Sequence, residues 1–388
     1  MVGAAGEDAA KWLAEREKAL EEALANLVNV NSFTENVEGG KAVAKLLEPL
    51  YAHEALTLSK RPSTKFADHL TWTSRGVEGV PPLALIGHLD TVFPPGTFEG
   101  YRRDGELARG PGVLDMKGGL VVVAFALKAV AETMGLDNIA PLRIVIVADE
   151  EVGSPEGQGI IGSVVSDASN ALVFEAGRAA DAIITRRRGT GALVVTARGK
   201  AAHAGNNHRD GANAIRALAR FVERAEALTD YAKGVSVNVG TIRGGESKNT
   251  VPDFAEAKLD LRFETRADAD ALLENLRLAA NEVALPGTKL ELEGGVLRSP
   301  LERTEKSVSL MHAYAEAAQK SGLGSSEAGL IGGGSDASTS HALGIASIDG
   351  LGPRGVGFHT KDEQITLKTL LLKAQALARF LAVANRPR

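Results

Sequence analysis

The first part of the chain alternates helical patterns with short segments that are apolar on both faces. Apolar residues recur at helical spacing from Glu7 to about Val30, and a second helical pattern runs through GGKAVAKLLEPLYAHEA. Three short apolar runs follow, PPLALIG, LRIVIVA and NALVFEAG, and the helical segment GGLVVVAFALKAVAETM lies between the first two. Strands that are apolar on both faces and separated by helices are typical of α/β domains, so we predict a mostly parallel sheet.

The pattern changes between residues 189 and 297. Segments typical of strands and helices follow one another there in the order β-α-β-β-α-β, which is the order of a ferredoxin-like α+β unit. They are TGALVVTARG, GANAIRALARFVERAEALT, VSVNVGTIRGG, DFAEAKLDLRFE, ADADALLENLRLAANEVA and TKLELEGG. We therefore predict a discontinuous α/β domain of residues 1–188 and 298–388, interrupted by an α+β domain of residues 189–297.

Composition narrows the choice of partners and chemistry. The 388 residues include 44 Lys and Arg against 49 Asp and Glu, a formal net charge of −5, which argues against nucleic acid or an anionic membrane as partner. No apolar run approaches the roughly 20 residues of a membrane helix. The charged helical start is unlike a signal peptide, so we expect a cytoplasmic protein, although a secretory leader already removed would leave the same pattern. Cysteine is absent, which excludes thiolate nucleophiles and ligands.

Acidic and imidazole side chains follow three of the predicted strands. His88 and Asp90 come directly after the first strand, the triplet Asp149–Glu151 after the second, and Glu175 after the third. Each alone is typical of a surface histidine, a solvated turn or a helix cap. In open α/β sheets, however, ligand sites lie outside the carboxyl ends of the strands. The coincidence therefore predicts one functional crevice.

A pair of divalent cations would explain so many carboxylates in one place. A mixture of His, Asp and Glu suits Zn²⁺ in a protein without cysteine. Two metals about 4 Å apart need a bridging carboxylate. The candidate for that bridge is Asp115, which follows a glycine-rich loop and precedes the apolar helix. Its alternative role is a helix N-cap, and the two roles are compatible.

Seven motifs occur along the chain in the order GHLDTV, GPGVLDMKGG, DEEVGS, FEAG, GKAAHAG, GGGSDAS and GFHT. Together they resemble the M20 family of metallopeptidases, in particular its glutamate carboxypeptidases of the carboxypeptidase G2 type. The resemblance spans nearly the whole chain and implies a zinc-peptidase catalytic domain with an inserted lid and dimerisation domain. It also implies a homodimer with two Zn²⁺ ions per subunit, for which Co²⁺ or Mn²⁺ are alternatives.

Metal ligands follow from the resemblance residue by residue. His88 and Glu175 would bind one zinc ion, and Glu151 and His359 the other. Asp115 would bridge the two ions. The family likewise implies a cis peptide bond after Asp115.

The resemblance also implies catalytic roles. Glu150 would be the general base that deprotonates the bridging water and then protonates the leaving amine. Asp90 would lie behind the imidazole of His88 and fix its orientation. His203 would reach across a dimer into the partner's active site and stabilise the tetrahedral oxyanion. The alternative for His203 is a plain surface position.

Substrate contacts are implied in the inserted domain and in one loop. Asn249 and Arg262 would contact the substrate, the arginine through a terminal carboxylate. The alternative for Arg262 is an ion pair within its own sheet. Backbone N–H groups of a glycine-rich loop would receive the same carboxylate, and this loop contains Gly332, Gly333, Gly334 and Ser335. We interpret the run Arg186–Arg188 as a solvated hinge in preference to a substrate-carboxylate contact.

The predicted reaction is hydrolysis of the amide bond of a C-terminal amino acid by a hydroxide that bridges two metal ions. The substrate is a small peptide or an N-acyl amino acid. The main alternative is a deacylase similar to acetylornithine deacetylase or succinyl-diaminopimelate desuccinylase. A non-catalytic binding protein on the same scaffold would lack the base or some ligands, whereas this chain retains Glu150 and all five ligand positions.

Overall fold

The computed structural model of the chain describes residues 2–384. Contacts divide the chain into two compact units. The first unit is Met1–Thr185, Arg303–Leu330 and Ser335–Arg388, and the second is Arg186–Glu302 and Ile331–Gly334. Among the described residues, no helix combines the length and the apolar character needed to cross a bilayer.

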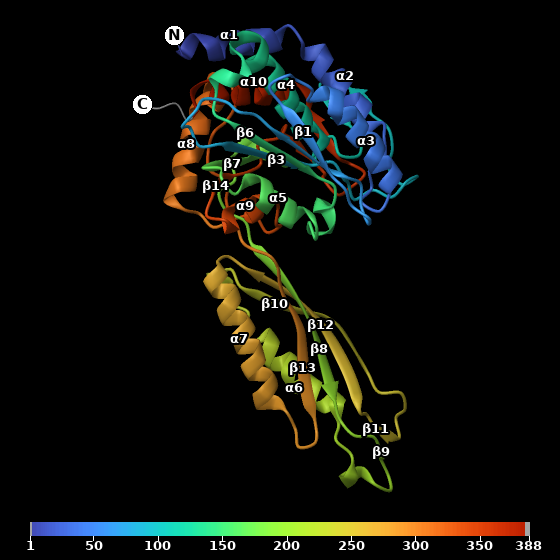
Figure 1. Cartoon of the computed structure of the whole chain (residues 1–388). Coiled ribbons are helices and arrows are strands. Elements are labelled where there is room, and N and C mark those ends of the chain that lie inside the picture. The colour runs from blue at the N-terminus through green and yellow to red at the C-terminus, as the bar shows by residue number, and fades with distance from the viewer. Residues whose placement is uncertain (1, 385–388) are drawn as a thin grey trace. The chain divides into compact units, whose positions relative to one another are not determined.

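A six-stranded sheet forms the centre of the first unit (Figure 1). Its strand order is β1-β2-β6-β3-β7-β14, in which β6, β3, β7 and β14 run parallel, and β1 and β2 pair antiparallel at one edge. The strands span Thr57–Arg61 (β1), His69–Thr73 (β2), Leu83–His88 (β3), Leu142–Val147 (β6), Asn170–Val173 (β7) and Ala346–Ile348 (β14). The predicted mostly parallel sheet is therefore confirmed.

Helices cover both faces of this sheet. In Figure 1, α1, α4 and α10 lie on one side of it, and α5 and α9 lie on the other. The helices of this unit span Val2–Ala14 (α1), Glu17–Val28 (α2), Val37–Leu50 (α3), Lys117–Met134 (α4), Gly157–Val165 (α5), Glu305–Lys320 (α8), Ala337–Ala342 (α9) and Leu367–Val383 (α10). The pattern from Glu7 to Val30 thus forms two helices. The break falls where the Arg16 side chain donates to the Trp12 carbonyl at 2.9 Å.

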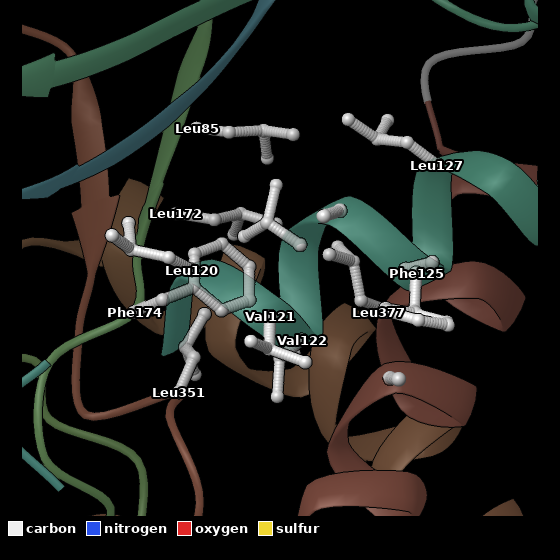
Figure 2. Packing of buried hydrophobic residues seen from close by; sticks show 14 of the residues in the cluster. Leu85, Leu120, Val121, Val122, Phe125, Leu127, Leu172, Phe174, Leu351 and Leu377 are labelled. Carbon is white, nitrogen blue, oxygen red and sulfur yellow. The ribbon is translucent and has the colours of Figure 1, made fainter. Parts of the chain in front are cut away.

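Helix α4 is buried from its first residue, as its uniformly apolar pattern predicts. Its side chains meet residues from the sheet and from α10 in one continuous core (Figure 2). The labelled members are Leu85, Leu120, Val121, Val122, Phe125, Leu127, Leu172, Phe174, Leu351 and Leu377. A Cβ on Gly119 would lie 2.0 Å from the carbonyl oxygen of Phe174. Glycine therefore lets α4 begin directly against the end of β7, next to Glu175.

A small four-stranded sheet, ordered β15-β16-β5-β4, joins two loops of the first unit that are far apart in sequence. Its strands span Arg102–Asp104 (β4), Leu107–Arg109 (β5), Gly355–Val356 (β15) and Gln364–Thr366 (β16). Because β16 pairs with β5, Gln364 lies opposite Arg109. This pairing brings the loop of Asp115 beside the loop of His359.

The second unit is an antiparallel sheet, ordered β10-β12-β8-β13, with two helices packed on one face. Its elements span Gly189–Arg198 (β8), Ala214–Glu226 (α6), Ser236–Gly244 (β10), Phe254–Phe263 (β12), Arg266–Val283 (α7) and Lys289–Arg298 (β13), with a ribbon of Ala202–His203 (β9) and Thr250–Val251 (β11). The structure thus has the predicted order β-α-β-β-α-β, to which the ribbon is added. Short 3-10 turns in the chain span Leu136–Asn138, Glu150–Val152, Ala179–Asp181, His208–Asp210 and Tyr231–Lys233.

Candidate active site

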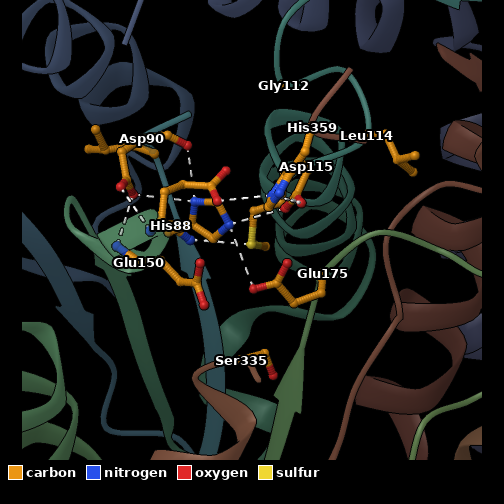
Figure 3. A network of polar contacts seen from close by, with 12 residues as sticks. His88, Asp90, Gly112, Leu114, Asp115, Glu150, Glu175, Ser335 and His359 are labelled. Atoms are coloured by element: carbon orange, nitrogen blue, oxygen red, sulfur yellow. Dashed lines mark hydrogen bonds and ion pairs between the residues drawn. The ribbon is translucent and has the colours of Figure 1, made fainter. Parts of the chain in front are cut away.

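The candidate site lies at the carboxyl ends of three parallel strands. His88 is the last residue of β3, Glu150 and Glu151 follow β6, and Glu175 follows β7. Parallel strands end at the same edge of a sheet, and the side chains meet there (Figure 3). Ligand atoms of His88, Glu150 and Glu175 all lie within 4.8 Å of one another, as do those of His88, Asp115 and Glu151.

Asp115 lies between two imidazoles. Its Oδ1 is 3.3 Å from Nε2 of His88, and its Oδ2 is 3.3 Å from Nε2 of His359. The peptide bond from Asp115 to Met116 is cis, as the resemblance implied. The N-cap position of α4 is occupied by Met116, so the alternative role of Asp115 as N-cap is wrong. Both oxygens of Asp115 are thus directed toward the cluster.

Two glutamates contact the same two imidazoles, one glutamate at each ring. Glu175 Oε1 is 3.6 Å from Nε2 of His88, and Glu151 Oε2 is 3.1 Å from Nε2 of His359. Each half of the cluster therefore holds one histidine, one glutamate and one oxygen of Asp115. Two cations that share a bridging carboxylate require this kind of arrangement.

The pKa values of this cluster are shifted, because its carboxylates are buried together and outnumber its imidazoles. Burial, followed by the nearby charge of Asp115, raises the pKa of Glu151 to about 8. Burial also raises the pKa of Glu175 well above its usual range. Hydrogen bonds to Asp115 and Glu151 raise the pKa of His359 to about 10. Without cations, the cluster therefore holds protons at neutral pH that metal ions would displace.

The donor atoms of the cluster fit a metal centre. Among the described residues, Nε2 of His88 and Oε1 of Glu151 are buried without a hydrogen-bond partner. Such buried polar atoms normally have one. Imidazole nitrogen and carboxylate oxygen are also the ligands that Zn²⁺ takes where no thiolate is present. The chemistry of the residues is therefore consistent with divalent cations.

Asp90 links the end of β3 to the turn that follows β6. Its Oδ1 is 3.3 Å from Nδ1 of His88 and accepts the backbone N–H of Glu150 at 3.2 Å. Its Oδ2 accepts the N–H of Glu151 at 3.1 Å and the hydroxyl of Thr34 at 2.8 Å. One buried carboxylate thus contacts the imidazole of His88 and also holds the turn that carries both glutamates.

Asp149, the first acid of the triplet, has no place in the cluster. Its Oδ2 accepts the backbone N–H groups of Glu156 and Gly157 at 2.8 and 3.0 Å, where α5 begins. Its Oδ1 lies 3.9 Å from Nδ1 of the buried His69. The side chain therefore anchors α5 to the end of β6 and fixes the direction in which the next two residues leave the strand.

Comparisons with known proteins agree with this geometry. Residues 185–288 match the peptidase dimerisation domain of the M20 family. The chain is 28% identical over 376 residues to carboxypeptidase G2 of Pseudomonas sp. (strain RS-16), covering 95% of this chain and 89% of that one. The chain is a homologue of the M20 metallopeptidases.

Two further relatives match this M20 homologue in different ways, one over part of its sequence and the other in its fold. Acetylornithine deacetylase of Myxococcus xanthus is 36% identical over 186 residues, which cover 44% of this chain and 46% of that enzyme. The crystal structure of a dinuclear metal-binding peptidase of the M20 family from Bacillus subtilis superposes with a TM-score of 0.71 at 16% identity. That alignment covers 96% of this chain and 99% of the other, and it shows the common fold. The similarity to carboxypeptidase G2 over 95% of the chain indicates a peptidase or amidohydrolase.

The sequence did not point to Glu363, which ties the two ligand loops of the M20 homologue together. Its side chain is fully buried. One oxygen, Oε1, accepts the backbone N–H groups of Leu114 and Asp115 at 2.9 and 3.0 Å, and Oε2 accepts that of Gly112 at 3.2 Å. Glu363 follows His359 by four residues, so it links the histidine loop to the aspartate loop. No periodicity marks it, because its partners are backbone groups distant in sequence.

Replacing Glu363 with glutamine should weaken metal binding without unfolding the chain. The amide places an NH₂ group against a backbone N–H, so at least one of the three hydrogen bonds is lost. Loss of a group that orients a metal ligand typically costs about 10–100-fold in metal affinity. Competition with a chromophoric chelator measures this effect. The matched control is Asp362→Asn, whose exposed carboxylate pairs with Arg109 at 3.4 Å and should leave the affinity unchanged. Equal affinities in both variants would contradict a positioning role for Glu363.

The predicted substrate-binding residues of the second unit are placed as follows. His203 in β9 pairs with Thr250 in β11, and its Nδ1 accepts the N–H groups of Gly205 and Asn206, both at 3.1 Å. Its ring is therefore oriented with Nε2 as the remaining polar atom. Asn249 is exposed beside this ribbon and hydrogen-bonds to Ser247.

Arg262 has the partner that the alternative interpretation proposed. Its Nε and Nη2 donate to both oxygens of Asp260 at 2.8 and 3.0 Å within β12. Gly334 lies against the side chain of Arg298 in the second unit, whereas Ser335, in the first, donates to Asp349 at 2.6 Å. The structure therefore does not test the predicted substrate contacts, which stay predictions.

Proposed function

We propose that this M20 homologue is a two-metal amide hydrolase that removes a C-terminal amino acid from a small peptide or an N-acyl amino acid. The observation that carries the proposal is the position of Asp115, whose two oxygens each lie 3.3 Å from a different histidine. A carboxylate shared in this way suits two cations and a water molecule between them. A single structural metal would need only one half of the cluster.

His88 and Glu175 would hold one cation, Glu151 and His359 the other, and Asp115 both. The donor set favours Zn²⁺, with Co²⁺ or Mn²⁺ as alternatives. When bound, the cations polarise the scissile carbonyl and lower the pKa of a water molecule to about 7. The side chains of His88, Asp115 and Glu175 are buried, whereas that of His359 is 50% exposed. Asp90 contacts His88 and Glu363 accepts the backbone N–H of Asp115, so these two ligands need little reorganisation on binding.

Glu150 is the residue we propose to move the proton. Its ligand atom lies within 4.8 Å of those of His88 and Glu175, at the edge of the cluster, whereas Glu151 pairs with His359 at 3.1 Å. The carboxylate would take the proton of the attacking water and deliver it to the nitrogen of the departing amine. The backbone N–H of Glu150 donates to Asp90, and this bond fixes the backbone from which the carboxylate extends.

The remaining predicted site residues would contact the substrate. Arg262, Asn249 and the loop from Gly332 to Ser335 would receive the terminal carboxylate. In a homodimer, His203 of the second subunit would stabilise the oxyanion. The dimerisation domain supports this assembly. The cytoplasmic location also remains a prediction.

A deacylase is the second candidate, favoured by the match to acetylornithine deacetylase over 186 residues. Full-length similarity to carboxypeptidase G2 favours release of a C-terminal amino acid. The two activities differ in which side of the amide bond fills the pocket, and not in the metal chemistry.

A substrate panel tests the proposal on protein whose metal content has been measured. Peptides and N-aroyl amino acids with C-terminal glutamate should be hydrolysed faster than N-acetylornithine or N-succinyl-diaminopimelate. Faster hydrolysis of the second group would favour the deacylase. No hydrolysis in either group by protein carrying two metal ions per chain would overturn the proposed function.

A further inference from the structure

Arginine side chains hold loops in place in both units of the chain. In the second unit, Arg187 is only 4% exposed, and its Nη1 donates to the carbonyl of Gly333 at 3.1 Å. The interpretation of the run Arg186–Arg188 as solvated is therefore wrong for Arg187. In the first unit, Arg178 lies close to the candidate metal centre, since it follows Glu175 by three residues.

The two imidazoles of the cluster are held in different ways. His88 is buried, and its Nδ1 lies 3.3 Å from Oδ1 of Asp90. His359 is half exposed, and its Nδ1 has no hydrogen-bond partner in the part of the chain that the structure describes. A metal-binding histidine normally donates its second ring nitrogen to a carboxylate or a carbonyl group, which fixes the ring. The orientation of the His359 ring therefore depends on other contacts.

The backbone of His359 is also unusual. Its φ is 62°, in the left-handed region that residues other than glycine rarely adopt. The residue lies in a turn closed by the N–H of Thr360, which donates to the carbonyl of Gly357 at 3.0 Å. The hydroxyl of Thr360 donates to the same carbonyl at 2.7 Å. These bonds fix the backbone of the turn, and the direction of the imidazole is left to its neighbours.

Phe358 and Arg178 supply the contacts that reach this imidazole. The ring of Phe358 meets that of His359 edge to face, with 5.5 Å between the centroids and 82° between the planes. The guanidinium carbon of Arg178 lies 5.2 Å from the centroid of Phe358, within the range of a cation–π interaction. The guanidinium thus supports the phenyl ring, and the phenyl ring supports the imidazole.

Backbone contacts within the first unit bring Arg178 to this position. The N–H of Gly177 donates to the carbonyl of Pro353 at 3.1 Å. A Cβ on Gly177 would lie 2.4 Å from the carbonyl oxygen of Gly352, so glycine lets the two segments run side by side. The end of β7 therefore lies against the segment that leads to His359. The three stacked side chains connect the ligand loops of the two proposed cation sites.

We propose that Arg178 and Phe358 are positioning residues for His359, and that they take the place that Asp90 has for His88. The inference rests on the proposed two-metal function, because the ring that they orient is a ligand of one of the two cations. A phenyl ring held by a guanidinium limits rotation of the imidazole without contacting the metal. Loss of this stack should weaken the cation site that contains His359 and spare the other site.

Stepwise titration of the chelated full chain with Zn²⁺, in competition with a chromophoric chelator, tests the positioning role. Phe358→Leu removes the aromatic ring and keeps an apolar side chain, so it should weaken one of the two zinc sites by about 10–100-fold. Phe358→Tyr keeps the ring and should restore the wild-type affinity. Arg178→Gln should weaken the same site, and Arg178→Lys, which keeps the cation, should weaken it less. The matched control is Val356→Ala, which changes an exposed apolar residue of the same segment and should leave both affinities unchanged.

The double variant Phe358→Leu/His359→Ala separates positioning from a general effect on the fold. His359→Ala removes the ring that Phe358 orients, so adding Phe358→Leu should not change the remaining zinc affinity. A further loss of affinity in the double variant would show that Phe358 acts elsewhere, and would overturn the proposal. The absorption spectrum of the Co²⁺-loaded chain reports the geometry of the ligands. It should change in Phe358→Leu and return to that of wild type in Phe358→Tyr.

The positioning role and the two-metal function fail separately. Unchanged zinc affinities in Phe358→Leu would overturn the positioning role and leave the two-metal function intact. A wild type that binds a single zinc ion would contradict the two-metal function. The positioning role would then be decided by whether Phe358→Leu weakens that one site and Phe358→Tyr restores it. Equal melting temperatures of the chelated wild type and variants establish that the losses are not due to unfolding.

Discussion

The Glu150→Gln variant should keep its metal ions and its fold but lose most of its turnover. The glutamine side chain has the same shape and no basic carboxylate, so it cannot accept the proton of the attacking water. Loss of a positioned general base typically lowers kcat by about 10²–10⁴-fold. The KM should change much less, because Glu150 is not among the residues proposed to bind the substrate. Steady-state kinetics on protein of known metal content measure both quantities.

Two further variants serve as comparisons for Glu150→Gln. Glu132→Gln changes an exposed glutamate on α4 and should leave kcat unchanged. Glu151→Ala should instead lose metal, because Glu151 contacts His359 at 3.1 Å within one half of the cluster. If Glu150→Gln retained both metal ions and hydrolysed at the wild-type rate, the proposed role of Glu150 would be wrong.

Removing the metal ions should destabilise the protein, and the loss should grow as the pH rises. Glu151 has a pKa raised from 4.5 to about 8 by burial, and His359 has one raised from 6.5 to about 10 by its hydrogen bonds to Asp115 and Glu151. Groups with raised pKa values bind protons on folding. Their contribution to stability is present at low pH and disappears as the pH rises through the folded pKa values. The metal-free chain should therefore lose stability between about pH 5 and pH 10.

Bound cations should prevent this loss of stability at high pH. They neutralise the carboxylates after these have lost their protons. At free metal about 100 times the Kd, each site adds about 2.7 kcal/mol to the free energy of unfolding. Melting temperatures of chelated and zinc-loaded protein from pH 5 to pH 9 test the effect. The gap between the two curves should widen as the pH rises. Identical melting temperatures at every pH would show that the acidic cluster does not bind metal.

The position of the site followed from the sequence, because strand ends are visible as abrupt changes from apolar to charged residues. His88, Glu151 and Glu175 each follow a buried strand, and parallel strands deliver such residues to one edge. His359 is different, since it lies on a loop with a positive φ of 62° and follows only a short strand. The resemblance, and not the pattern of apolar residues, placed it in the site.

Other features depend on tertiary contacts that local sequence does not encode. Glu363 acts through backbone groups about 250 residues away in the chain. The anchoring of α5 by Asp149 appears only when the turn after β6 is known. The burial of Arg187 was missed because a run of three arginines is usually solvated. In each case the partners, and not the residue type, decide the role.

Five residues of the first unit should together hold two cations, with Asp115 between them. The zinc content of chelated and then zinc-reconstituted protein, measured by mass spectrometry under native conditions, tests this arrangement most directly. Wild type should carry two zinc ions per chain, and Asp115→Ala should carry fewer than one, because both sites lose a ligand. A wild type that binds a single zinc ion, or an Asp115→Ala variant that still binds two, would contradict the account.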